Sequence, residues 1–150
     1  MTPKTPISTL RPTRRKPTTR RAWLAASACL VLLHGAAQAA DTSPAQQLER
    51  FSAQAATPGQ AERGRVFFSS RQGGEWSCAS CHGNPPTRPG KHASTGKSID
   101  PLAPAANPKV FTDTARVDKW FRRNCKDVLQ RECSAAEKAD VLAYLIGLKP

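Results

Sequence analysis

The run Cys78-Ala79-Ser80-Cys81-His82 constrains this chain more than any other feature of its sequence. A C-x-x-C-H sequence is the attachment motif of covalent haem. Two thiols three positions apart can add to the two vinyl groups on one edge of a porphyrin, and the adjacent histidine then reaches the iron from a fixed side. Imidazole is a suitable axial ligand for haem iron. The motif therefore predicts one haem c, bound covalently by Cys78 and Cys81, with His82 as the proximal iron ligand.

Two other readings of the cysteine pair are disfavoured by the rest of the sequence. A thioredoxin-like redox pair would need a βαβ setting, and the sequence has no such pattern. A zinc site would need further thiol or imidazole ligands at matching spacing, and the chain lacks a second C-x-x-C pair. Haem attachment is therefore the interpretation that the context favours.

Residues 1–39 have the layout of a secretory signal peptide. The first 21 residues contain seven basic residues and no acidic residue, and an apolar run over 22–33 follows. Ala37-Gln38-Ala39 then provides an A-x-A cleavage site. We therefore predict a signal peptide over 1–39 and a periplasmic monohaem domain over 40–150. An uncleaved membrane anchor is the alternative, but the apolar run is short for a membrane span, which needs about 20 residues.

Much of the positive charge belongs to that leader. The full sequence carries a net charge of +12, and the leader contributes seven of the basic residues. The remaining 16 Lys and Arg against 11 Asp and Glu leave a net charge near +5. Two haem propionates would lower this value by about two. Nucleic-acid binding is therefore not expected, and a modest basic face that docks an acidic redox partner is favoured.

Apolar residues recur at helical spacing in four segments of the mature chain, and no segment reads as a convincing strand. The Pro- and Gly-rich residues 83–109 cannot form a long helix or strand, and they predict a loop that wraps one edge of the haem. Ser43 and Ser134 are the expected N-caps of the first and last helices. We expect four helices. The first starts at Pro44 and ends before Thr57-Pro58, the second spans about 59–70, the third runs from about 113 to near 124, and the fourth spans about 135–148.

The distal side of the iron has no obvious ligand. Electron carriers with this motif commonly place a methionine there, but the only methionine in the sequence is Met1, in the leader. His92, the lysines and Asn124 remain as candidates. His92 lies in the Pro- and Gly-rich loop ten residues after His82. A short connection would therefore have to cross from one haem face to the other. Asn124 follows the expected helix that carries Trp120.

Two thiols remain after haem attachment, Cys125 and Cys133. In an oxidising compartment, two leftover thiols eight residues apart are expected to pair. Their disulfide would clamp the loop that carries Asn124. The alternative is that Asn124 only caps the C-terminus of its helix and that the disulfide only staples a small fold.

The residues around Asn124 resemble a known family, the sphaeroides haem proteins, which are high-spin class I cytochromes c. The resemblance covers about residues 41–148. In class I cytochromes c the N-terminal helix crosses the C-terminal helix closely at a glycine, with aromatic residues packed at the crossing. Gly64, Phe68 and Tyr144 match that arrangement. The resemblance implies an all-α class I cytochrome c fold, with short helices around one haem. The similar stretches are 95–104, 111–125, Cys133 and 137–140.

The resemblance also implies a function. In that family an asparagine binds ferric iron and leaves on reduction, after which oxygen or nitric oxide can bind. The matching residue is Asn124, with Cys125 and Cys133 as the matching disulfide. The implied redox partners are a di-haem cytochrome c and a membrane cytochrome b. The alternative is a plain low-spin electron-transfer cytochrome with His92 or a lysine as sixth ligand.

The sequence has no further acid–base constellation around the motif. We therefore expect an electron-transfer or ligand-binding protein rather than an enzyme. Reaction of the reduced protein with oxygen could itself look like oxidase activity.

Overall fold

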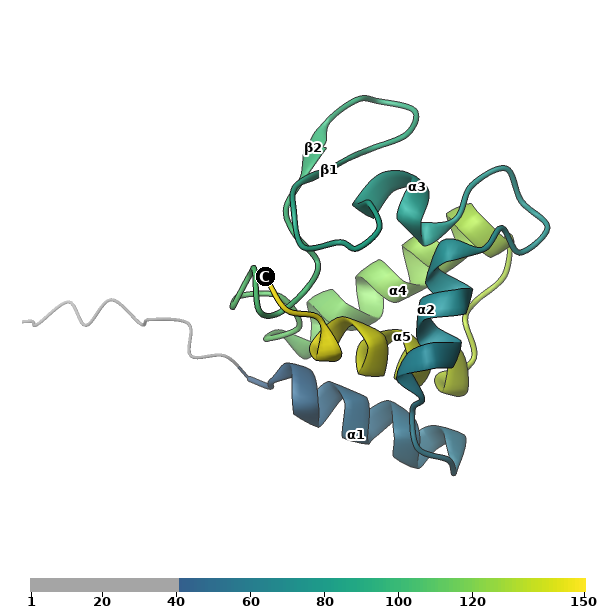
Figure 1. The fold of residues 1–150 in the computed structure, drawn as a ribbon. Coiled ribbons are helices and arrows are strands. Elements are labelled where there is room, and N and C mark those ends of the chain that lie inside the picture. Colours follow the sequence, from purple (N-terminus) through teal and green to yellow (C-terminus); the bar gives the residue numbers. More distant parts are fainter. Residues whose placement is uncertain (1–40) are drawn as a thin grey trace, which may run out of the picture. The chain divides into compact units, whose positions relative to one another are not determined.

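The computed structural model describes residues 41–150, and the predicted signal peptide lies outside the described residues. Within 41–150 the chain forms five helices and one short antiparallel hairpin (Figure 1). No helix in this part of the chain is long and apolar enough to cross a membrane. The predicted all-α class is confirmed. The elements are α1 (Pro44–Ala55), α2 (Ala61–Ser69), α3 (Cys78–His82), β1 (Gly90–Lys91), β2 (Ser98–Ile99), α4 (Thr114–Leu129) and α5 (Ala135–Gly147).

The first and last helices begin at the predicted capping residues. The Ser43 hydroxyl accepts a hydrogen bond from the backbone N–H of Gln46 at 3.2 Å. At the start of α5, the Ser134 hydroxyl accepts from the Glu137 N–H, and the Glu137 carboxylate accepts from the Ser134 N–H at 2.7 Å. These bonds satisfy backbone donors that a helix start leaves unpaired. Both predicted N-caps are confirmed.

α2 and α5 cross at a glycine. Gly64 lies directly against the backbone carbonyl of Asp140, and a Cβ on Gly64 would lie 3.0 Å from the Tyr144 Cβ. Only a residue without a side chain allows the two backbones to approach this closely. Beside the crossing, the rings of Phe68 and Tyr144 pack with their centroids 5.6 Å apart. The predicted crossing at Gly64 is confirmed.

Two clusters of buried side chains form the core, and each of them packs residues of α5 against residues of other helices. The first packs Phe51 of α1 against Leu142 of α5. The second packs Phe68 of α2 against Leu145 of α5, and Cys78 of α3 lies against this cluster. α5 therefore joins α1 and α2, and the second cluster anchors the inner side of α3.

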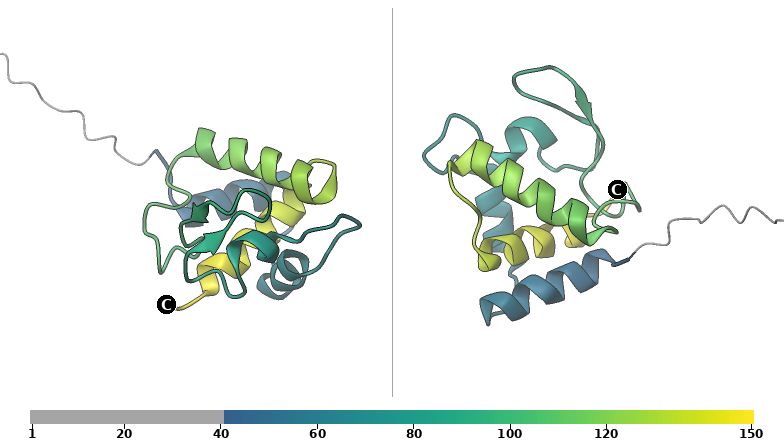
Figure 2. Two further views of the ribbon diagram at one scale, coloured as in Figure 1. Left: turned by 90° about the horizontal axis from the view of Figure 1, so that it is seen from above. Right: turned by 180° about the vertical axis from the view of Figure 1, so that it is seen from behind.

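α4 is longer than the sequence predicts, and it lies along an outer side of the described unit (Figure 2). The expected end near Asn124 is wrong, because the helix continues to Leu129 and is capped by Gln130 in the left-handed conformation with φ 57°. An asparagine inside a helix costs less than about 1 kcal/mol relative to alanine, and burial of the next residue, Cys125, offsets that cost. Asn124 therefore lies within a helix and neither follows it nor caps it.

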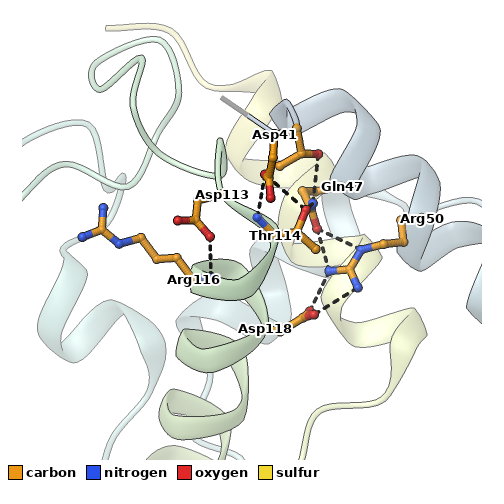
Figure 3. A network of polar contacts seen from close by, with 8 residues as sticks. Asp41, Gln47, Arg50, Asp113, Thr114, Arg116 and Asp118 are labelled. Carbon is orange, nitrogen blue, oxygen red and sulfur yellow. Dashed lines mark hydrogen bonds and ion pairs between the residues drawn. The ribbon is translucent and has the colours of Figure 1, made fainter. Parts of the chain in front are cut away.

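A polar network ties the start of α4 to α1 (Figure 3). The buried Gln47 side chain donates to the Thr114 hydroxyl at 3.1 Å and accepts from the Arg50 guanidinium at 2.6 Å. Arg50 also pairs with Asp118 at 2.6 Å. The Asp41 carboxylate accepts from the backbone N–H of Thr114 at 2.9 Å. Because both ends of the Gln47 amide are hydrogen-bonded, these bonds offset the cost of its burial. The first turns of α4 are thereby held against α1.

Candidate haem site

The two cysteines and the histidine of the motif lie on α3, a helix of five residues. The Ser77 N–H donates to the Ser80 hydroxyl at 3.0 Å, which stabilises the start of this short helix. Cys78 and Cys81 are three positions apart, so they lie on one side of the helix. Both thiols are free and partly buried. The structure thus brings Cys78, Cys81 and His82 together, as haem attachment requires.

Burial favours the neutral forms of Cys78 and His82. Desolvation raises the pKa of the Cys78 thiol to about 11, and burial lowers the pKa of His82. A neutral imidazole is the form that donates to a metal. The Nδ1 atom of His82 is buried and has no hydrogen-bond partner among the described residues. A buried polar atom without a partner is costly, so the His82 ring is suited to a group that the chain itself does not supply. Haem fits this donor set.

A hairpin packs on the outer side of α3. Gly90 lies against the Cys81 carbonyl, and a Cβ there would lie 2.9 Å from the His82 Cα. The backbone N–H of Ala93 donates to the Cys81 sulfur at 3.3 Å. The predicted loop over 83–109 therefore contains a small hairpin, and that hairpin holds the C-terminal half of α3 in place.

His92 lies at the turn of this hairpin and is partly buried. Its Nδ1 atom is 3.2 Å from the Ser94 hydroxyl and accepts from the Thr95 N–H at 3.4 Å. The ring therefore takes part in the turn. It belongs to the segment that packs against α3, the helix of the candidate proximal ligand.

Asn124 lies on α4, whereas Cys78, Cys81 and His82 lie on α3. Asn124 is partly buried. Its amide forms no hydrogen bond with another described residue. The next residue, Cys125, forms a disulfide with Cys133, and their Cα atoms are 5.5 Å apart. Both cysteines are buried. The bond joins the last turns of α4 to the segment before α5. Phe121, one turn before Cys125, packs against the same cluster as Cys78 of α3.

Two residues that support the motif, Gly90 and Ala93, carry no functional signal in the sequence, although both contact Cys81. A glycine within a segment full of turn residues gives no local signal that it is a contact point. The two-residue strands β1 and β2 are also too short to show a period.

Helices packed around α5, with a C-x-x-C-H helix against their core, define a monohaem c-type cytochrome with a class I cytochrome c-like fold and covalently bound haem c. A family described as "Domain of unknown function (DUF1924)" matches residues 54–145. The chain belongs to this family, and to that of the sphaeroides haem protein. It is 52% identical to the cytochrome c-type protein SHP of Cereibacter sphaeroides over 118 residues, which cover 76% of this chain and 91% of that protein.

Cytochrome c'' of Methylophilus methylotrophus is a further relative, 46% identical over 87 residues, which cover 55% of this chain and 60% of that protein. Among solved structures, oxidised SHP, described as an oxygen-binding cytochrome c, matches with a TM-score of 0.66 and 52% identity over 70% of this chain and 96% of that one. Oxidised cytochrome c'' matches with a TM-score of 0.63 and 36% identity over 71% of this chain and 95% of that one.

Proposed function

We propose that this protein is a periplasmic cytochrome that accepts electrons and, in its ferrous form, releases Asn124 and binds oxygen or nitric oxide. The observation that carries the proposal is the set of donors. The only methionine is Met1, and Asn124 offers an uncommitted, partly buried amide on α4, beside a buried disulfide.

Haem held by Cys78, Cys81 and His82 would supply an iron that changes between the ferric and ferrous states and would leave one ligand position free. Asn124 offers an amide oxygen to that position. An amide oxygen is a hard, weak donor, which suits a ferric ion better than the softer ferrous ion. Reduction therefore favours withdrawal of the Asn124 side chain, and the two arrangements are populations of one equilibrium.

The surroundings of Asn124 support this role. The disulfide between Cys125 and Cys133 holds the following turn of α4, so the amide is presented from a constrained backbone. The network of Gln47 and Arg50 holds the first turns of the same helix. A ligand on a fixed helix can leave by side-chain rotation, without unfolding of the helix.

His92 is the rival ligand, and its contacts disfavour it. One ring nitrogen is engaged by Ser94 and Thr95, and the hairpin that carries it packs on α3 through Gly90. His92 therefore belongs to the segment that supports the helix of His82. A low-spin electron-transfer cytochrome with His92 as ligand would need this hairpin to leave α3. A lysine as ligand is tested by the Asn124→Ala spectrum described below.

One relative supports the choice of oxygen as the small molecule that binds, because the solved structure of SHP is described as an oxygen-binding cytochrome c. By the same resemblance we propose a di-haem cytochrome c and a membrane cytochrome b as redox partners, and export to the periplasm by a signal peptide over 1–39.

Optical spectra of the haem-loaded protein test the proposal. Carbon monoxide should shift the Soret band of the ferrous protein as soon as the two are mixed. Asn124→Ala should change the ferric spectrum, and the control His92→Ala should leave it unchanged. A low-spin ferrous spectrum that carbon monoxide does not alter, or a ferric spectrum that changes only in His92→Ala, would refute the role of Asn124.

A further inference from the structure

The solvent side of α4 carries a row of cations. Arg116, Lys119, Arg123 and Lys126 follow one another at spacings of three, four and three residues, so they share one side of the helix. All four are exposed. Figure 2 shows α4 uncovered along its outer side in both views, and Figure 3 shows the Arg116 side chain extending away from the α1 network. With the exposed Arg122, these residues form what we call the basic face of α4.

Within residues 41–150, no cation of the basic face has a carboxylate within 4.0 Å; the ion pairs there use Arg50, Arg63, Arg65 and Arg131. α4 contains two acidic residues, and Asp118 is already engaged by Arg50. Like charges at helical spacings of three and four residues destabilise a helix by a few tenths of a kcal/mol per pair. An acidic surface placed against this face would remove that repulsion.

The basic face also dominates the charge of the whole domain. Residues 41–150 contain 16 Lys and Arg and 11 Asp and Glu. The five cations of the face therefore equal the whole excess of positive charge, because the other 11 basic residues balance the 11 acidic ones. α4 itself contains these five cations and two acidic residues, Asp118 and Asp127, so the helix carries a net charge of +3. A surface of one charge sign steers an oppositely charged partner.

Trp120 orders part of this face. Its ring centroid lies 5.6 Å from the Arg123 guanidinium carbon and 5.9 Å from the Lys119 Nζ. Both distances lie within the range of a cation–π interaction. The contact limits the freedom of two long side chains before a partner arrives, which lowers the entropy lost on binding.

We propose that the basic face of α4 is the docking site for an acidic patch on the protein that exchanges electrons with this cytochrome. The inference rests on the proposed electron-accepting function, because it assigns that function a partner surface. Asn124 lies on the same helix, so a partner seated there would also be close to the candidate distal ligand. A surface for nucleic acid or for anionic lipid is the rival assignment, and the test below separates it.

Electron transfer from fully reduced flavodoxin, an acidic one-electron carrier, is the kinetic test. One electron leaves the flavin hydroquinone, which becomes the semiquinone, and converts ferric haem to ferrous haem. The variant is K119E/R123E, and the matched control is R88E/K149E, which changes the net charge equally at exposed residues outside α4. At low ionic strength we expect the second-order rate constant to fall about tenfold or more in the variant and less than about threefold in the control. Equal losses in both would overturn the proposal.

Zero-length carbodiimide cross-linking is a test that does not depend on the rate. The reagent condenses a carboxylate of flavodoxin with a lysine amine, with loss of water. We expect cross-links at Lys119 and Lys126 that disappear at high salt. Cross-links spread evenly over Lys97, Lys138 and Lys149 would overturn the proposal, even if carbon monoxide binding confirms the haem chemistry. Conversely, cross-links at α4 would support the surface even if Asn124 proved not to be the ligand.

Vesicles of phosphatidylglycerol and a DNA oligonucleotide complete the comparison. If the vesicles or the oligonucleotide compete with flavodoxin, and bind the cytochrome more tightly than flavodoxin does at physiological salt, the face is a general polyanion site. The proposed protein partner is then refuted. Weaker binding of both, with the flavodoxin cross-links retained, is the expected result.

Discussion

Replacing Gly64 by alanine should destabilise the fold at the crossing of α2 and α5. The new methyl group would overlap the Asp140 carbonyl and lie 3.0 Å from the Tyr144 Cβ, whereas carbon atoms pack at about 3.5–4.0 Å. The two helices would have to separate by roughly 1 Å. Overpacking of this kind costs about 1–3 kcal/mol. We expect the upper end of that range, because a backbone carbonyl cannot rotate away.

Alanine has a higher helix propensity than glycine by about 1 kcal/mol, which opposes this loss. The net destabilisation should therefore be about 2 kcal/mol, which lowers the Tm of a domain of this size by roughly 10 °C. Thermal unfolding of the haem-loaded protein, followed by circular dichroism at 222 nm, measures it.

Gly147→Ala is the matched control, because nothing lies within 4 Å of a Cβ at that position. It should leave the Tm unchanged or raise it slightly. If Gly64→Ala is as stable as the wild type, the close approach at the crossing is not a constraint, and the reasoning fails.

Three further changes test other parts of the fold. The hydrogen bond from Arg131 lowers the pKa of Glu137 below its ordinary value of 4.5. Stability from this carboxylate is therefore fully present above pH 4.5 and is lost as the pH falls through the folded-state pKa. Urea unfolding of the wild type and of Glu137→Gln should differ at pH 7, and the difference should shrink as the pH is lowered below 4.5. Replacing Cys125 and Cys133 by serine should cost about 2–3 kcal/mol, and thiol titration should find no free thiol at these two positions in the native protein. Gly90→Ala should push the hairpin away from α3 and lower both the Tm and the ratio of haem to protein. An unchanged ratio and Tm would contradict the role of the hairpin in holding α3.

The sequence predicts those parts of the fold in which one residue type is required locally. Gly64 could be identified because its place before the haem motif matches the glycine at the helix crossing of class I cytochromes c, where a residue without a side chain is needed. Ser134 could be identified because it precedes a glutamate at the spacing of a capping box. The spacing of Cys78 and Cys81 suits two thioether links, so the motif and its context in the sequence predict haem attachment at these residues.

The parts that were not predicted depend on contacts between segments far apart in the chain. α4 continues through Asn124 because Cys125 is buried in the folded domain, and helix propensity alone does not report that burial. The bond from Gln47 to Thr114 joins positions 67 residues apart. The approach of Gly90 to Cys81 depends on the path of an irregular loop. The roles of Asn124 and His92 towards iron stay predictions.

α4 unites the two proposals. The Gln47 network holds the start of this helix, and the disulfide of Cys125 holds its end, so α4 has little freedom to move as a whole. Asn124 and the basic face then share one constrained element. A partner that docks on α4 could therefore change the chance that Asn124 rotates away only by a differential contact with the two side-chain arrangements. Because binding free energies are reciprocal, a small ligand that displaces Asn124 would change the affinity for that partner by the same factor. If carbon monoxide leaves the affinity of the ferrous protein for flavodoxin unchanged, docking and release of Asn124 are independent events on the same helix.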